Sequence, residues 1–230
     1  MNGLFFTGTD TGVGKTFVAC SVARILRRQG CEVTVCKPVA TGASWQDGRL
    51  VSEDTLHLAE AAGLEKCPEK VTSWTFADPV APPVAARRAG IDLKISDMVK
   101  VVNNLRDSIR VLLVEGVGGL LCPLTERETV ADLVAMLDMR LIVITRRTLG
   151  TLNHTLLTLE VARSRSLQIA GMIVNETTPA KTLAEETNVI ELAKRSHAPL
   201  LATVPYRSGK EPVDPPCLEA IDWQELCQAG

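Results

Sequence analysis

The feature that most constrains this chain is a glycine-rich segment near its start, Gly8-Thr-Asp-Thr-Gly-Val-Gly-Lys-Thr16. A short apolar run over residues 4–7 precedes it, and apolar residues at helical spacing follow it from Phe17 to Leu26. A strand, a glycine-rich turn and a helix that opens on Gly-Lys-Thr form the context of a phosphate-binding P-loop. Glycines let backbone N–H groups turn toward an anion, and the helix N-terminus adds partial positive charge. The segment therefore predicts a nucleotide site, with Lys15 on the β/γ phosphates and the Thr16 hydroxyl on a phosphate-bound Mg²⁺.

The spacing of this segment departs from the usual P-loop pattern. Thr9 stands where a glycine is expected, and Gly8 lies one position too early. The alternative is an ordinary strand–helix turn in which Lys15 and Thr16 follow by chance. The flanking strand and helix patterns favour the nucleotide site.

Strand and helix patterns alternate along the whole chain. The expected strands cover residues 4–7, 32–37, 75–77, 110–115, 140–145, 169–174 and 200–204, and the expected helices cover 17–29, 52–59, 84–88, 95–109, 129–137, 148–163, 183–194 and a segment ending near 226. This alternation predicts a single α/β domain over residues 1–230, with a doubly wound, mostly parallel sheet flanked by helices, as in P-loop NTPases. Residues 44–49 are expected to be a polar, mobile loop. Apart from that last helix, no structure and no role are predicted for residues 208–230.

The composition favours an enzyme that acts on small molecules. The formal net charge of −2 provides no electrostatic basis for binding nucleic acid or an anionic membrane. No apolar run reaches the ~18 residues of a membrane span, and no signal-peptide pattern is present, so we expect a cytoplasmic protein. The seven cysteines form no CxxC pair and are expected to be reduced and mostly buried.

Three charged residues outside the loop are candidates for chemistry. Lys37 and Glu115 end expected strands, where ligand-contacting residues of open α/β sheets lie, and Asp54 opens an expected helix. A P-loop threonine with one or two carboxylates is a ligand set that Mg²⁺ favours, and a second lysine suits phosphoryl transfer. Structural alternatives exist for each: a solvated lysine for Lys37, a helix cap for Asp54 and a salt bridge for Glu115.

An ordered set of segments resembles the dethiobiotin synthetase family from residue 1 to about 207. The set comprises the loop Gly8–Thr16, Lys37-Pro-Val-Ala-Thr-Gly42, Asp54, Val114-Glu-Gly-Val-Gly-Gly119, Leu149-Gly-Thr-Leu-Asn-His154 and Val174-Asn175. The resemblance implies ATP- and Mg²⁺-dependent ring closure of 7,8-diaminononanoate with CO₂ (or bicarbonate) to give dethiobiotin, ADP and phosphate. It also implies a homodimer.

The resemblance assigns roles to particular residues. The implied catalytic residues are Lys37, Lys15 and Thr11, and the implied metal ligands are Thr16, Asp54 and Glu115. The implied ATP-binding residues are Gly12, Val13, Gly14, Lys15, Thr16, Phe17, Asp54, Glu115, Gly116, Val117, Gly118, Asn175, Glu176, Pro205, Tyr206 and Arg207. The implied substrate-binding residues are Thr11, Thr41 and Gly118 at the diamine, with Leu149, Gly150 and Asn153 at its carboxylate tail across the dimer interface.

The chain departs from the family pattern at position 12, where Gly12 replaces a common glutamate, and at Thr41, which replaces a common serine. Two other functions are compatible with a P-loop sheet. A switch ATPase of the partition or septum-positioning type typically has a further lysine early in the loop, where this chain has Thr9 and Asp10. A cobyrinate amidation enzyme would need a glutaminase portion, which this sequence lacks.

Overall fold

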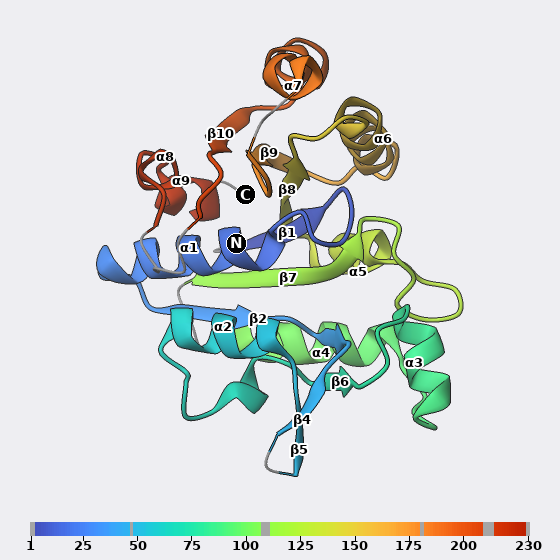
Figure 1. The fold of residues 1–230 in the computed structure, drawn as a ribbon. Helices are drawn as coiled ribbons and strands as arrows, with labels where there is room; N and C mark the ends of the chain where they lie inside the picture. The colour runs from blue at the N-terminus through green and yellow to red at the C-terminus, as the bar shows by residue number, and fades with distance from the viewer. Residues whose placement is uncertain (1–2, 47, 107–110, 180–181, 209–213, 229–230) are drawn as a thin grey trace.

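A six-stranded parallel sheet forms the centre of the protein in the computed structural model, which describes residues 3–46, 48–106, 111–179, 182–208 and 214–228 (Figure 1). In spatial order the strands are β10 (Leu200–Val204), β9 (Ile169–Asn175), β8 (Arg140–Arg146), β1 (Gly3–Gly8), β7 (Val111–Gly119) and β2 (Val33–Cys36). Every neighbouring pair is parallel, which confirms the predicted fold class. Strand β1 lies between β8 and β7 at the centre of the sheet, and the phosphate loop follows its last residue.

Helices cover both faces of this sheet. One face carries α1 (Lys15–Arg28), α2 (Glu53–Ala62), α8 (Pro216–Glu219) and α9 (Trp223–Gln228), and the other carries α4 (Ile95–Arg106), α5 (Val130–Leu137), α6 (Thr151–Ser164) and α7 (Leu183–Arg195). Successive side chains of a strand point to opposite faces. In β1, Leu4 and Phe6 accordingly pack in the core under α1, whereas Phe5 packs in the core on the other face.

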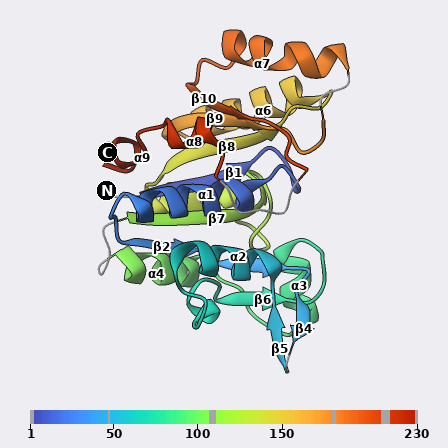
Figure 2. The ribbon, with the colours of Figure 1, turned by 60° about the vertical axis from the view of Figure 1, so that its left-hand side comes forward.

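A smaller group of elements lies beside β2. It contains the parallel pair β3 (Val39–Thr41) and β6 (Trp74–Phe76), the helix α3 (Pro82–Arg88), the short helix η1 (Pro68–Lys70) and the hairpin of β4 (Ser44–Gln46) and β5 (Arg49–Val51). The expectation of a loop over 44–49 is wrong, because β4 and β5 pair antiparallel there. Figures 1 and 2 show this hairpin projecting from the body of the protein.

Several predicted boundaries need correction. Strand β7 does not end at Glu115 but continues to Gly119, because Gly119 still pairs with Gly8 of β1. The expected C-terminal helix consists of two short helices, α8 and α9. The described part of helix α4 ends at Arg106. The last residues of the predicted helix, 107–109, lie outside the described residues. None of the seven cysteines is disulfide-bonded, but only Cys20, Cys36 and Cys227 are buried, so the prediction of mostly buried thiols is wrong.

The C-terminal segment is attached to α1 by two ion pairs to one buried carboxylate. The Asp214 side chain is fully buried and accepts hydrogen bonds from Arg24 at 2.6 Å and from Arg28 at 2.6 Å. Burial raises the pKa of Asp214, but the hydrogen bonds from the two arginines outweigh burial and hold its pKa below the ordinary value. Trp223 is buried against the same face of the sheet. The described residues of this C-terminal segment, to which the sequence assigned no role, therefore pack against the helix that begins at the phosphate loop. Among the described residues, no helix is long and apolar enough to cross a bilayer.

Candidate active site

The loop between β1 and α1 has the backbone geometry of an anion cradle. Gly12 and Gly14 have φ angles of +67° and +91°, a region that favours glycine. A Cβ on Gly8 would lie 2.8 Å from Val13 Cγ2 and 2.9 Å from the carbonyl oxygen of Asp10, so the early glycine is needed for close packing of the loop. A Cβ on Gly12 would meet nothing within 4 Å, so its backbone angle, and not crowding, favours glycine there.

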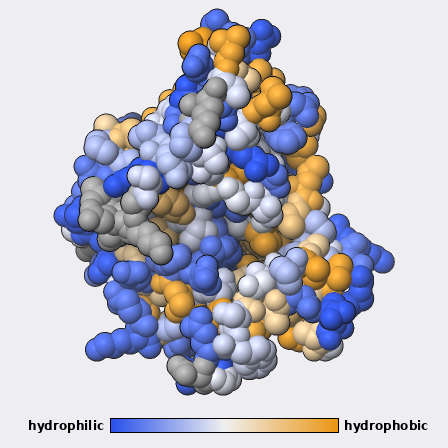
Figure 3. Space-filling model, in the orientation of Figure 1, coloured by the Kyte–Doolittle hydropathy of each residue, from blue (hydrophilic) through white to orange (hydrophobic). Residues whose placement is uncertain are grey.

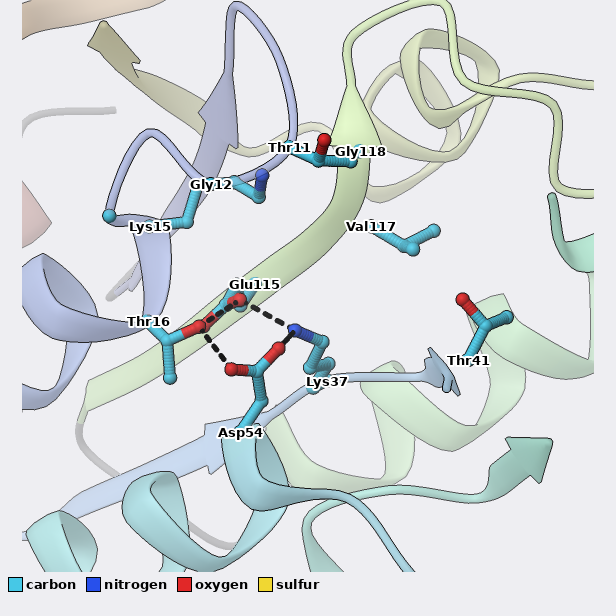
Figure 4. Close-up of a pocket in the computed structure, with 11 residues that line it drawn as sticks. Thr11, Gly12, Lys15, Thr16, Lys37, Thr41, Asp54, Glu115, Val117 and Gly118 are labelled. Atoms are coloured by element: carbon cyan, nitrogen blue, oxygen red, sulfur yellow. Dashed lines mark hydrogen bonds and ion pairs between the residues drawn. The ribbon is translucent and has the colours of Figure 1, made fainter. Parts of the chain in front are cut away.

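Four side chains predicted from separate segments converge beside this loop (Figure 4). The Thr16 hydroxyl lies 2.9 Å from Asp54 Oδ1 and 2.8 Å from Glu115 Oε1. The Lys37 ammonium donates to Glu115 Oε1 at 2.7 Å and to Asp54 Oδ2. Lys37 is 4% exposed and Glu115 1% exposed. The salt-bridge alternative for Glu115 is thus realised, but with a lysine that lines the same cavity as the phosphate loop. The solvated-lysine alternative for Lys37 is wrong, because its side chain is buried.

The electrostatics of the cluster follow from its burial. Burial lowers the pKa of Lys37, but Glu115 and then Asp54 outweigh burial and raise its pKa above the ordinary value. Burial raises the pKa of Asp54, but Lys37 and the hydrogen bond from Thr16 outweigh burial and lower it. Lys15 has its pKa lowered, chiefly by burial. Lys37 is therefore held as a cation and Asp54 as an anion.

The oxygen atoms of this cluster fit a magnesium ion. Thr16 has one hydroxyl proton, yet its oxygen lies within hydrogen-bond distance of two carboxylate oxygens. The second oxygen of Glu115, Oε2, is buried and has no hydrogen-bond partner among the described residues. A buried carboxylate oxygen without a partner is costly, and hard oxygen donors suit Mg²⁺. Phosphate oxygens and water would complete the coordination, because the described residues contain no group of three acidic, cysteine or histidine side chains placed to hold a metal alone.

The cluster forms one wall of a cavity of about 360 Å³. The opposite side carries the Thr11 and Thr41 side chains, together with Val117 and Gly118 at the end of β7 (Figure 4). Lys15 also lines the cavity, and its Nζ lies 2.9 Å from the carbonyl oxygen of Asp10. The cavity thus joins the phosphate loop to two further hydroxyl groups and a glycine backbone.

The residues expected near the base form a second group, at the ends of β9 and β10. Asn175 is 7% exposed, and its Nδ2 donates to the carbonyl oxygen of Val13 at 3.0 Å. Glu176 accepts a hydrogen bond from the backbone N–H of Tyr206 at 3.2 Å and pairs with Arg147. Asn175 is therefore locked against the phosphate loop, and the Pro205–Arg207 segment is tied to the end of β9 at Tyr206.

Other predicted residues do not line the cavity. Val13 is fully buried, Phe17 is 38% exposed, and a Cβ on Gly116 would touch the ring of Phe5 in the core. The predicted tail-binding residues lie at the start of α6, where Leu149 is 83% exposed and Asn153 is also exposed. Within one chain, Leu149, Gly150 and Asn153 line no part of this cavity.

Sequence reasoning missed the contacts between the phosphate loop and the end of β8. Arg146 pairs with Asp10 at 2.6 Å, and the Thr9 hydroxyl donates to the Thr145 hydroxyl at 3.2 Å. The available signal was positional, because a basic residue directly follows the apolar strand next to β1. The Thr9 contact also gives a reason for the irregular residue in the P-loop pattern.

Comparisons with known proteins agree with this geometry. The AAA domain family AAA_26 matches residues 2–213. The ATP-dependent dethiobiotin synthetase BioD of Anaeromyxobacter dehalogenans (strain 2CP-C) is 42% identical over 208 residues, covering 90% of this chain and 91% of that protein. The protein of the same name from Thermodesulfovibrio yellowstonii is 35% identical over 234 residues, covering 97% of this chain and 98% of that protein.

Solved structures show the same fold at much lower sequence identity. The ParA family ATPase from Chlorobium tepidum TLS has a TM-score of 0.53 at 13% identity, covering 90% of this chain and 85% of that chain. The MinC:MinD cell division complex of Aquifex aeolicus has a TM-score of 0.52 at 16% identity, covering 90% and 82%. These structures establish the P-loop ATPase fold, and the sequence relatives, together with the AAA domain match, establish that the chain belongs to the dethiobiotin synthetase family.

Proposed function

We propose that this protein uses ATP to close the ureido ring of dethiobiotin from 7,8-diaminononanoate and CO₂. The observation that carries the proposal is the buried Lys37 beside Thr16, Asp54 and Glu115, in a cavity that also presents Thr11 and Thr41. A plain nucleotide hydrolase needs a phosphate loop and a metal site. A second buried lysine and two further hydroxyl groups suit an additional, anionic reactant.

The reaction proceeds in three steps. One amine of the substrate adds to CO₂ and loses a proton, which gives a carbamate. A carbamate oxygen attacks the γ-phosphorus and ADP leaves, which gives a carbamic–phosphoric anhydride. The second amine attacks the carbamoyl carbon, its proton is released and inorganic phosphate departs, leaving the cyclic urea. Both amines belong to one molecule, so ring closure is intramolecular and the protein mainly positions groups and neutralises charge.

Each wall of the cavity has a role in this scheme. The backbone from Gly12 to Thr16 binds the phosphates, and Lys15 leaves the Asp10 carbonyl for the β/γ phosphates. Lys37 stabilises the carbamate and the transferring phosphoryl group. Thr11 and Thr41, with the backbone at Gly118, hold the diamine or its carbamate.

Thr16, Asp54 and Glu115 would hold Mg²⁺, which when bound neutralises charge on the phosphate oxygens. Asn175 reads the base, because its Nδ2 is already used by Val13 and its Oδ1 is left to accept from an amino group. Gly12, Gly14 and Phe17 at the phosphates, and Glu176 with Pro205–Arg207 around the base, complete the proposed ATP site.

We also propose that the protein is a homodimer that completes the site for the substrate tail. Leu149, Leu157 and Leu121 are 83%, 56% and 51% exposed, and Figure 3 shows hydrophobic residues at the surface along the side that carries α6. A second copy packed there would cover these leucines and would place its Leu149, Gly150 and Asn153 near the cavity. Leu149→Asp should give a monomer by sedimentation that binds nucleotide but uses the diamine poorly. A monomeric wild-type protein with full activity would exclude this assembly.

The central test is reconstitution with diaminononanoate, bicarbonate, Mg²⁺ and ATP, followed by phosphate release and product mass. We expect one phosphate for each cyclic urea and little ATP turnover without the diamine. ATP turnover that is indifferent to the diamine, with no cyclic urea formed, would instead favour a switch ATPase. The likeness to MinD and ParA proteins is a likeness of fold alone and does not by itself favour that function.

A further inference from the structure

Arg146 is the last residue of β8 and reaches the front of the phosphate loop. Strand β8 pairs with β1 so that Ile144 lies beside Gly8, which places Arg146 next to the residues that follow Gly8. Its Nη2 lies 2.6 Å from Asp10 Oδ2, with the two side chains 34% and 45% exposed. The contact joins residues that are 136 positions apart in the sequence.

Asp10 connects this arginine to two residues of the cavity. Its Oδ1 accepts the backbone N–H of Thr11 at 2.7 Å, and its carbonyl oxygen accepts Lys15 Nζ at 2.9 Å. Arg146 thus fixes one carboxylate oxygen while the other sets the turn at Thr11. A change at Arg146 would be transmitted to Thr11, which lines the cavity.

The preceding residue of the loop is held from the same strand end. The Thr9 hydroxyl donates to Thr145, whose hydroxyl lies 2.7 Å from that of Thr151 and 2.9 Å from that of Thr155. Thr145, Thr151 and Thr155 are all buried. Thr9 is therefore anchored independently of Arg146, so loss of Arg146 should loosen Asp10 and Thr11 without unfolding the loop.

The charge of Arg146 matters as well as its position. ATP and a carbamate are both anions, and Asp10 is an anion directly beside Thr11. Without Arg146 the Asp10 carboxylate would stand unneutralised beside Thr11, which holds the diamine end and its carbamate in the proposed reaction, and like charges repel at this range. We propose that Arg146 is a positioning residue for the diamine end of the reaction, acting through Asp10 on Thr11. This inference rests on the proposed function.

A matched surface ion pair provides the control. Arg165 and Asp132 lie 2.7 Å apart with side chains 38% and 36% exposed, close to the values for Arg146 and Asp10, and neither lines the cavity. Exposed pairs of this kind contribute little to stability. Arg165→Gln therefore measures what an ordinary pair of this exposure contributes.

The experiment compares Arg146→Gln, Arg146→Lys, Arg165→Gln and the double variant Arg146→Gln with Asp10→Asn. For each, KM for the diamine, KM for ATP, diamine binding by calorimetry and the thermal unfolding temperature are measured. Arg146→Gln should raise KM and Kd for the diamine by about tenfold, the range of one charge-assisted hydrogen bond, with little change in unfolding temperature. Arg146→Lys should recover most of the loss. The double variant should perform better than Arg146→Gln alone, because the introduced amide carries no charge and keeps an oxygen for the Thr11 N–H.

Two results would overturn the inference. In the first, Arg146→Gln changes KM and Kd for the diamine no more than Arg165→Gln does. In the second, Arg146→Gln lowers the unfolding temperature and weakens the binding of both the diamine and ATP to a similar degree, and the double variant recovers none of the loss. Failure of the proposed function is a separate outcome, because the wild-type protein would then neither bind the diamine nor form the cyclic urea.

Discussion

Replacing Lys37 with methionine tests whether this lysine neutralises the buried carboxylate at the centre of the site. Methionine keeps most of the side-chain volume and removes the charge. Among the described residues, Glu115, which is 1% exposed, would retain only the Thr16 hydroxyl as a hydrogen-bond partner, whereas the Asp54 side chain is 43% exposed and can be solvated. Removing one partner of a buried ion pair costs about 3–5 kcal/mol. For a protein of this size that corresponds to a lower unfolding temperature by roughly 6–20 °C.

Magnesium should reverse part of this loss. A bound Mg²⁺ would supply positive charge to the same carboxylates, and in the wild-type protein it would compete with the Lys37 ammonium for Glu115 and Asp54. We therefore expect Mg²⁺, added in the presence of ADP, to raise the unfolding temperature of Lys37→Met more than that of the wild-type protein. Scanning calorimetry with Mg²⁺ or with a chelator measures both differences without relying on activity.

The exposed pair of Lys100 and Asp97 serves as the control. Lys100 is 3.1 Å from Asp97 and its side chain is 73% exposed, so Lys100→Met should change the stability by no more than about 0.5 kcal/mol. If metal-free Lys37→Met unfolds at the wild-type temperature, Lys37 does not neutralise Glu115 in the way that the geometry indicates. An equal response of both proteins to Mg²⁺ would refute the competition between the ammonium and the metal.

Two further predictions concern the phosphate loop and the C-terminal segment. Gly14→Ala should weaken ATP binding by about tenfold or more in a titration, on the order of one lost hydrogen bond to a charged group, because the added Cβ would lie 2.1 Å from Asn175 Nδ2. Gly30 is the control, because its φ of +84° is similar and the space around an added Cβ is open. Gly30→Ala should therefore leave ATP binding unchanged. Asp214→Asn should lower the urea midpoint near neutral pH. Because the folded-state pKa of Asp214 is lowered, the stability that its carboxylate contributes is present above pH about 4 and is lost as the pH falls through the native pKa. The difference in urea midpoint between the wild-type protein and the variant should therefore narrow in acid. A gap that stays constant from neutral to acid would contradict this account.

The local patterns of the sequence determined most elements of the fold. The strand β10 has the predicted bounds Leu200–Val204, and α5 begins one residue after its predicted start at Thr129 and ends at Leu137 as predicted. These elements were predictable because burial on both faces of a parallel strand, or on one face of a helix, leaves a signature within a few residues. The hairpin β4–β5 was missed for the converse reason, since Ser44–Gln46 is exposed throughout and carries no buried alternation.

The candidate site was predictable where its residues lie in a phosphate-loop pattern or in the carboxyl-terminal half of a strand or just after it. Thr16, Lys37 and Glu115 were predicted to meet because parallel strands deliver their carboxyl ends to one edge of a sheet. Their spacing in the sequence left open whether Asp54 was only a helix cap. The N-cap position of α2 is Ser52, and the 2.9 Å contact between Asp54 and Thr16 shows that Asp54 faces the phosphate loop.

The sequence by itself determined that a nucleotide loop follows the first strand of a parallel α/β sheet. The loop motif is local, and the strand and helix patterns repeat along the chain. Only the tertiary structure decided what holds the loop and the C-terminal segment in place. Arg146 meets Asp10 across 136 positions, and Asp214 meets Arg24 across 190. Neither contact has a periodic or spacing signal, because a salt bridge between distant segments depends on which strands become neighbours in the sheet. That order is set by the packing of the whole chain.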